Sequence, residues 1–164
     1  MTITNFIEQL KESERVWFYG FSKQLNHSQL LDLKNLLSAF TEQWTSHGKQ
    51  VEGKSMLIDD TLIAITVDND FLEASGCSID SSVQVIKEIT EKYSLDTFDR
   101  LKIGVLQSGK IKYLRENQVK VQLKEEGLSL HSLYLDETVV MGSRKKELLK
   151  PIADSWMLKR ISIG

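Results

Sequence analysis

The run Val51-Glu-Gly-Lys-Ser-Met-Leu-Ile-Asp-Asp-Thr-Leu-Ile-Ala-Ile-Thr-Val67 decides the fold that the sequence predicts. Both of its halves are rich in apolar and β-branched residues, which is typical of strands. The Asp59-Asp60 pair between them is typical of the tight turn of a hairpin. We therefore expect two paired strands, over residues 51–58 and 61–67.

Strands and helices alternate on both sides of this hairpin. Apolar residues at steps of three and four predict the helices, and dense aromatic or β-branched runs predict the strands. The further expected elements are a strand over 15–21, a helix from Asn26 that stops at 46–48, a helix over about 79–93, and strands over 101–106 and 110–114. The order β-α-β-β-α-β is the ferredoxin-like split βαβ pattern.

These elements predict an α+β protein of one domain over residues 1–164. We expect a two-layer sandwich with a ferredoxin-like core over 15–107 and an α/β C-terminal extension over 108–164. A chain of 164 residues with 41% hydrophobic residues is long and apolar enough to bury one ordinary core.

Composition excludes several classes of protein. The chain has 21 Lys and Arg against 23 Asp and Glu, so no overall positive field favours nucleic acid or an anionic membrane. A single cysteine excludes an internal disulfide and a multi-cysteine zinc site, and we expect neither a metal nor a cofactor. Without a signal-peptide pattern or an apolar run of about 20 residues, we expect a cytoplasmic protein that does not insert into membranes.

The segment Ser75-Gly-Cys-Ser-Ile-Asp80 is the candidate functional site, because it contains the only cysteine of the chain and this cysteine stands where a helix is expected to start. In a split βαβ arrangement, the end of the first helix, the end of the third strand and the start of the second helix meet at one edge of the sheet. We therefore expect Trp44 and His47 to lie near Asp68 and Cys77.

Three interpretations of this segment stay open. In the first, Cys77 is a nucleophile and His47 its base; these are the candidate catalytic residues. In the second, Cys77 is a small residue that helps the loop to pack, and the negative charge of Asp80 disfavours a thiolate beside it. In the third, the loop is a cradle for an anion, formed by Ser75, Gly76 and Ser78.

The leading hypothesis about function is a small binding or regulatory module with a pocket between the His47 turn and the Cys77 loop. The candidate ligand-binding residues are Trp44, Gly48, Asp68, Ser75, Gly76, Ser78 and Asp80. The ligand is an unidentified small molecule or protein, and a homodimer formed through the sheet is compatible with this hypothesis. A thiol enzyme that uses Cys77 and His47 is the alternative.

The run Gly48-Lys-Gln-Val-Glu-Gly-Lys-Ser55 matches the phosphate-binding pattern G-x-x-x-x-G-K-[ST]. That chemistry requires a strand before the loop and a helix after it, so that the helix N-terminus faces the phosphates. Here a helix is expected before the match and a strand after it. The order of elements therefore favours an ordinary polar connection.

The elements Trp44-Thr-Ser-His-Gly48 and Ser75-Gly-Cys-Ser-Ile-Asp80, followed by Phe98-Asp-Arg100, carry a resemblance to a known family. Across roughly residues 15–107 the chain resembles a small uncharacterised family found mainly in Bacteroidetes, whose members are often labelled "ABC transporter ATPase". The resemblance pairs the His-Gly and Ser-Gly-Cys segments, and the family label implies ATP binding as a third hypothesis.

Overall fold

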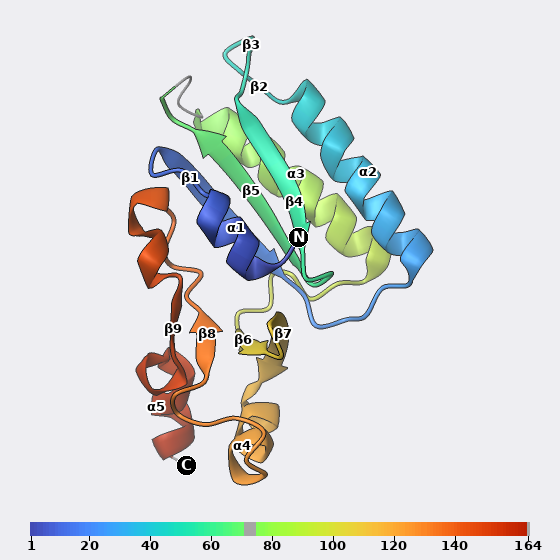
Figure 1. Ribbon diagram of the computed structural model, residues 1–164. Coiled ribbons are helices and arrows are strands. Elements are labelled where there is room, and N and C mark those ends of the chain that lie inside the picture. The colour runs from blue at the N-terminus through green and yellow to red at the C-terminus, as the bar shows by residue number, and fades with distance from the viewer. Residues whose placement is uncertain (71–74, 164) are drawn as a thin grey trace.

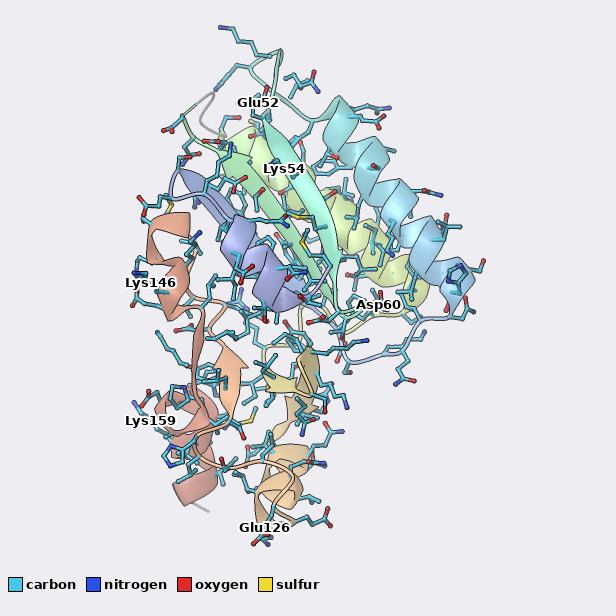
Figure 2. All side chains as sticks on the ribbon, viewed as in Figure 1. Glu52, Lys54, Asp60, Glu126, Lys146 and Lys159 are labelled. Carbon is cyan, nitrogen blue, oxygen red and sulfur yellow. The ribbon has the colours of Figure 1, made fainter. Side chains whose placement is uncertain are left out.

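The hairpin expected over 51–67 is present in the computed structural model, which describes residues 1–70 and 75–163. It consists of β4 (Gly53–Ile58) and β5 (Leu62–Asp68). Asp59 and Asp60 both adopt positive φ, at 51° and 58°, and the Thr61 amide donates to the Ile58 carbonyl at 3.1 Å. This is the two-residue turn whose twist suits a hairpin, with Asp60 at its tip (Figure 2). The prediction of the hairpin is confirmed.

Strand β5 is the centre of the first sheet and is buried along its whole length. The strand order is β1-β5-β4, and β1 (Glu14–Gly20) pairs antiparallel with β5. Because side chains alternate between faces, Ile65 packs towards α2 (His27–Gln43) and α3 (Gly76–Tyr93), while Ala64 packs towards the opposite face. The sheet is therefore covered on both sides.

The second face is covered by a helix that the sequence analysis did not predict, α1 (Ile3–Gln9), which crosses the sheet in Figure 1. Thr2 caps it by accepting a hydrogen bond from the Asn5 amide at 3.2 Å. Phe6 of this helix is fully packed in the core. The sheet consequently lies between two layers of packing, whereas we expected a two-layer sandwich.

The expected ferredoxin-like topology is not confirmed, because the strand after α3 joins a different sheet. In that topology β6 (Lys102–Gln107) would lie beside β1. It pairs instead with β7 (Lys110–Arg115) and with β8 (Leu133–Leu135) in a second sheet of order β7-β6-β8-β9. The free edge of β1 is met by a later segment, since the Val16 amide donates to the Val140 carbonyl at 2.9 Å.

The second sheet has its own core. The remaining elements are β2 (Thr45–Ser46), β3 (Lys49–Gln50), α4 (Glu116–Lys124), η1 (Gly142–Glu147), β9 (Leu149–Pro151), η2 (Ile152–Asp154) and α5 (Trp156–Ile163). Helices α4 and α5 contribute Val119 and Met157 to this core, where they pack with Val105 of β6. Across the described residues the protein is thus a mixed α+β structure with three antiparallel sheets, of which the third is the short β2-β3 pair.

The first and second sheets meet at β7. The Tyr113 ring lies directly against the backbone of Gly20, where an added Cβ would stand 1.7 Å from a ring carbon. The Tyr113 hydroxyl donates to Glu137 at 2.5 Å, and burial holds the pKa of Tyr113 well above its usual value. The Ile111 amide donates to the Asp59 carboxylate at 2.9 Å, which ties the tip of the first hairpin to the second sheet.

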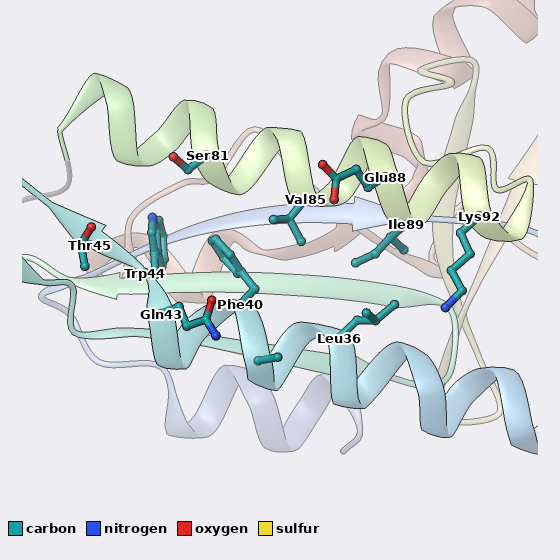
Figure 3. Close-up of a pocket in the computed structure, with 11 residues that line it drawn as sticks. Leu36, Phe40, Gln43, Trp44, Thr45, Ser81, Val85, Glu88, Ile89 and Lys92 are labelled. Atoms are coloured by element: carbon teal, nitrogen blue, oxygen red, sulfur yellow. The ribbon is translucent and has the colours of Figure 1, made fainter.

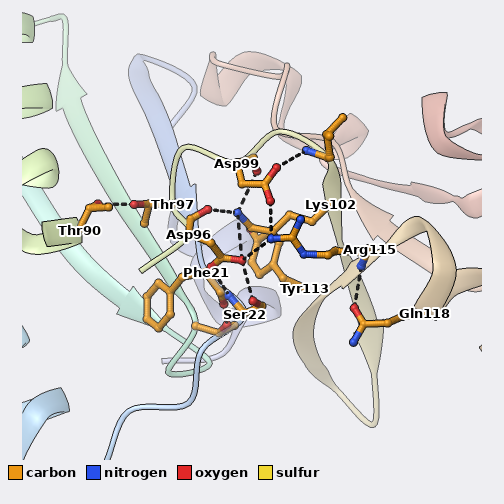
Figure 4. A network of polar contacts seen from close by, with 12 residues as sticks. Phe21, Ser22, Thr90, Asp96, Thr97, Asp99, Lys102, Tyr113, Arg115 and Gln118 are labelled. Carbon is orange, nitrogen blue, oxygen red and sulfur yellow. Dashed lines mark hydrogen bonds and ion pairs between the residues drawn. The ribbon is translucent and has the colours of Figure 1, made fainter. Parts of the chain in front are cut away.

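A buried lysine holds the connection between α3 and β6 (Figure 4). The Lys102 side chain is 3% exposed, and its ammonium donates to the carbonyls of Asp96 and Asp99, the latter at 2.9 Å. Asp96 in turn accepts hydrogen bonds from the amide and hydroxyl of Ser22, at 2.8 and 2.6 Å. Burial lowers the pKa of Lys102, and the negative charges of the Asp96 and Asp99 carboxylates oppose this shift. This network links the ends of β1 and α3 to β6.

We expect Gly20→Ala to destabilise the protein by about 1–3 kcal/mol, because the added methyl group overlaps the Tyr113 ring. Gly76→Ala is the matched control, since a Cβ there meets nothing within 4 Å. Urea unfolding followed by circular dichroism measures both variants. Adding Tyr113→Leu to Gly20→Ala should recover part of the loss, and an equal loss in the two glycine variants would contradict the expectation.

Candidate functional site

Helix α3 begins three residues earlier than expected, which changes the setting of the cysteine. Ser75 is the N-cap, and its hydroxyl accepts a hydrogen bond from the Ser78 amide at 3.2 Å. Gly76 and Cys77 therefore lie inside the first helical turn, and both are exposed. Asp80 is also exposed but lies beyond that turn.

The expected role of His47 and Gly48 as the end of the first long helix is wrong. Helix α2 ends at Gln43, and His47 and Gly48 form the turn between β2 and β3, with φ of 51° and 75°. A glycine after an apolar helix is typical of a helix C-terminus, but a two-residue hairpin turn favours the same positive φ. Both residues are exposed.

The predicted meeting of the Trp44 and Ser75 segments is confirmed by two hydrogen bonds. The Trp44 indole nitrogen donates to the Ser78 carbonyl at 2.8 Å, and the Ser75 amide donates to the Ser46 hydroxyl at 3.2 Å. Trp44 is only 2% exposed. The end of α2 and the start of α3 are thus joined by direct contact, and Trp44 is a core residue whose polar atom is satisfied.

The glycine and lysine of the phosphate-binding pattern have other functions in this fold. Gly53 leaves room for the Trp44 ring, because a Cβ there would lie 2.5 Å from it. Lys54 is the second residue of β4, and its ammonium lies 3.4 Å from the Glu14 carboxylate. A strand follows the pattern where a phosphate site requires a helix, so the arrangement differs from a P-loop.

Asp68 faces away from the cysteine segment. Its carboxylate accepts hydrogen bonds from the Ser13 hydroxyl at 2.7 Å and the Lys11 ammonium at 3.0 Å, on the side of the sheet that α1 covers. The Asp70 amide donates to it as well, at 3.2 Å. The Ser13 hydrogen bond, followed by that of Lys11, lowers the pKa of Asp68 despite burial. The carboxylate oxygens of Asp68 therefore hold the end of β5 to the segment that precedes β1.

We expect Asp68→Asn to weaken the dependence of stability on acid pH. A carboxyl whose pKa is lowered by folding stabilises the native state above its unfolded pKa, about 3.9, and loses this contribution as pH falls through the folded pKa. Wild type should therefore lose more unfolding free energy than Asp68→Asn between pH 7 and pH 3. Urea unfolding across this range tests it, with Asp70→Asn, an exposed acid of the same turn, as the control.

The Cys77 and His47 pairing stays a prediction. Both side chains are exposed at the same end of the first sheet, but among the described residues no hydrogen bond joins them. The catalytic hypothesis therefore rests on their neighbourhood, which the Ser46 and Ser75 contact establishes.

Iodoacetamide labelling separates the two interpretations of Cys77. Because the residue is exposed, we expect complete labelling of the folded protein, and none in Cys77→Ser. Without a hydrogen bond between the two side chains, His47→Ala should leave the labelling rate within about twofold. A loss of about tenfold or more would show that His47 activates the thiol.

A groove of about 500 Å³ lies between α2 and α3, next to the predicted site (Figure 3). Its apolar walls come from Leu36 and Phe40 of α2 and from Val85 and Ile89 of α3. Trp44 closes one end, so it is the one member of the predicted ligand-binding set that lines this groove. The apolar spacing that predicted both helices did not predict a groove between them.

The polar groups of the groove lie at its ends and rim. Gln43, Thr45 and Ser81 stand at the Trp44 end, whereas Glu88 and Lys92 stand further along α3 (Figure 3). The Lys92 ammonium is engaged by Asp32 at 2.6 Å, and this contact raises the pKa of Lys92. The interior of the groove is therefore apolar, with uncharged hydrogen-bonding groups at one end.

Two further findings concern the part of the chain that the structure describes. No group of three or more histidine, cysteine, aspartate or glutamate residues there is arranged to hold a metal ion. None of its helices has the length and apolar character needed to cross a membrane.

Comparison with protein-family models, with curated proteins and with solved structures gives no significant match. The resemblance to the Bacteroidetes family stays a prediction, and the candidate function rests on the geometry of the chain itself.

Proposed function

We propose that this protein is a binding module for a small, neutral, mostly apolar molecule, held in the groove between α2 and α3. The observation that carries the proposal is the groove itself, about 500 Å³ in volume and bounded by Phe40, Trp44, Val85 and Ile89. Small-molecule sites in proteins usually have a volume of roughly 300–1,000 Å³, with apolar walls and a few polar groups.

The arrangement of charge disfavours an anionic ligand, and the apolar interior of the groove carries no charged group. Lys92 is neutralised by Asp32, and Glu88 is the remaining charged residue of the lining. The uncharged Gln43 and Thr45 at the Trp44 end suit one hydroxyl, carbonyl or amide group of a ligand whose body lies between the helices.

The base of the groove is rigid enough to act as a preformed site. Phe40 and Trp44 pack against each other with ring centroids 5.0 Å apart. The hydrogen bond from Trp44 to the Ser78 carbonyl fixes the distance between the two helices at this end. Ligand binding therefore requires little ordering of these side chains, which favours affinity. Through this hydrogen bond the predicted segment Ser75–Asp80 holds Trp44 in position, but the segment itself does not line the groove.

The neutral fluorescent probe N-phenyl-1-naphthylamine tests this proposal. We expect its emission to rise on binding to the wild-type protein and Ala39→Trp to weaken that binding by about tenfold or more, because Ala39 is exposed and lines the groove. Ser38→Trp is the matched control, since Ser38 is exposed on the same helix and does not line the groove. Equal binding by the two variants, or no binding by wild type, would contradict the proposal.

A further inference from the structure

A second groove, of about 350 Å³, lies beside the second sheet, where α4 and α5 meet the start of β6. Both helices lie at the end of the second sheet that points away from the first sheet (Figure 1). Its lining combines apolar surface from Leu101 and Trp156 with cationic groups from Arg115, Lys120 and Arg160. This groove shares no lining residue with the α2–α3 groove.

The apolar part of the groove is unusually accessible. Trp156 is 40% exposed and Leu101 is 53% exposed. Met157, next to Trp156, is fully buried and fixes the start of α5 against the second sheet. A tryptophan ring in the wall of a groove offers a flat apolar surface on which an aromatic ring can stack.

The cationic part of the groove carries an excess of positive charge. Arg115 is neutralised by Asp99 at 2.5 Å. Lys120 and Arg160, by contrast, share one carboxylate, that of Glu116, at 2.9 and 3.5 Å. One positive charge is therefore left without a carboxylate in this group of residues, which suits a ligand with a single negative charge.

Arg160 has the geometry to bind that charge. Its Nε faces Glu116, and among the described residues the two terminal amino groups of its guanidinium have no other partner. A guanidinium can donate two parallel hydrogen bonds to one carboxylate, which fixes the orientation of the ligand as well as its charge. The planar group and the flat ring of Trp156 belong to the same short helix, four residues apart.

From this combination we propose that the α4–α5 groove binds a small aromatic carboxylate. The ring stacks on Trp156 and contacts Leu101, and the carboxylate pairs with Arg160 and Lys120. The ligand class follows from charge complementarity and from the exposed tryptophan. The volume of the groove accommodates one or two fused rings with their carboxylate.

Isothermal titration calorimetry of the full chain with 2-naphthoate tests the proposal. We expect one binding site, with 2-naphthol and acetate each binding at least about tenfold more weakly, because each lacks one half of the recognition. Acetate binding as tightly as 2-naphthoate would overturn the aromatic part of the proposal. No heat of binding with 2-naphthoate would overturn the site.

Two neighbouring cations on α5 provide the matched variants. Arg160→Gln should weaken 2-naphthoate binding by about tenfold or more, whereas Lys159→Gln, which removes an exposed charge outside the groove (Figure 2), should change it by less than about twofold. Trp156→Leu should also weaken binding while it keeps an apolar side chain. An equal effect of the two cation variants would mean attraction to overall charge and would overturn the site.

Discussion

The burial of β5 on both faces is the constraint on which the rest of this structure depends. A strand with apolar side chains on both sides must be covered twice, since a single layer of helices would leave Leu62 and Ala64 against water. Helices α2 and α3 cover one side. The other side is closed by α1 together with residues of the second sheet and the C-terminal region, such as Ile111 and Leu148. The position of the second sheet is thus a consequence of the composition of one strand.

The same constraint explains why polar networks concentrate where the sheets meet. The loops at this junction bring backbone carbonyls and carboxylates away from water, and such groups are costly to bury without partners. Lys102 satisfies two of the carbonyls, and Asp96 is satisfied by Ser22. These residues have the burial and the shifted pKa values often found in active sites. Their hydrogen bonds are made within the junction, so we interpret these residues as structural.

Local features of the fold were predictable from the sequence, and long-range features were not. The β4–β5 hairpin and α2 followed from turn residues and from apolar spacing, which act over a few residues. Whether β6 pairs with β8 or with β1 depends on the relative free energies of pairing between segments that are distant in the sequence. The spacing of apolar residues along the chain does not encode these energies. Helix α1 was missed because seven residues show hardly two turns of a periodic pattern.

The candidate site was predictable to a similar extent. The contact between Trp44 and Ser78 followed from the order of elements, which places the end of one helix near the start of the next. The groove beside it depends on the distance between two helices, which no periodicity encodes. The α4–α5 groove could not be predicted from the sequence for the same reason, since Trp156 and Arg115 come from segments that only the completed second sheet brings together.

The closure of the first sheet by both ends of the chain has a consequence for its synthesis. Ile3 and Phe6 lie in the same core cluster as Val139 and Leu148. A ribosome that has released the first hundred residues has therefore supplied every strand of that sheet, but only part of the cover for its second face. The nascent chain carries an incompletely covered apolar surface until the segment around Leu148 has left the exit tunnel, and this is the interval in which a holding chaperone would be of use.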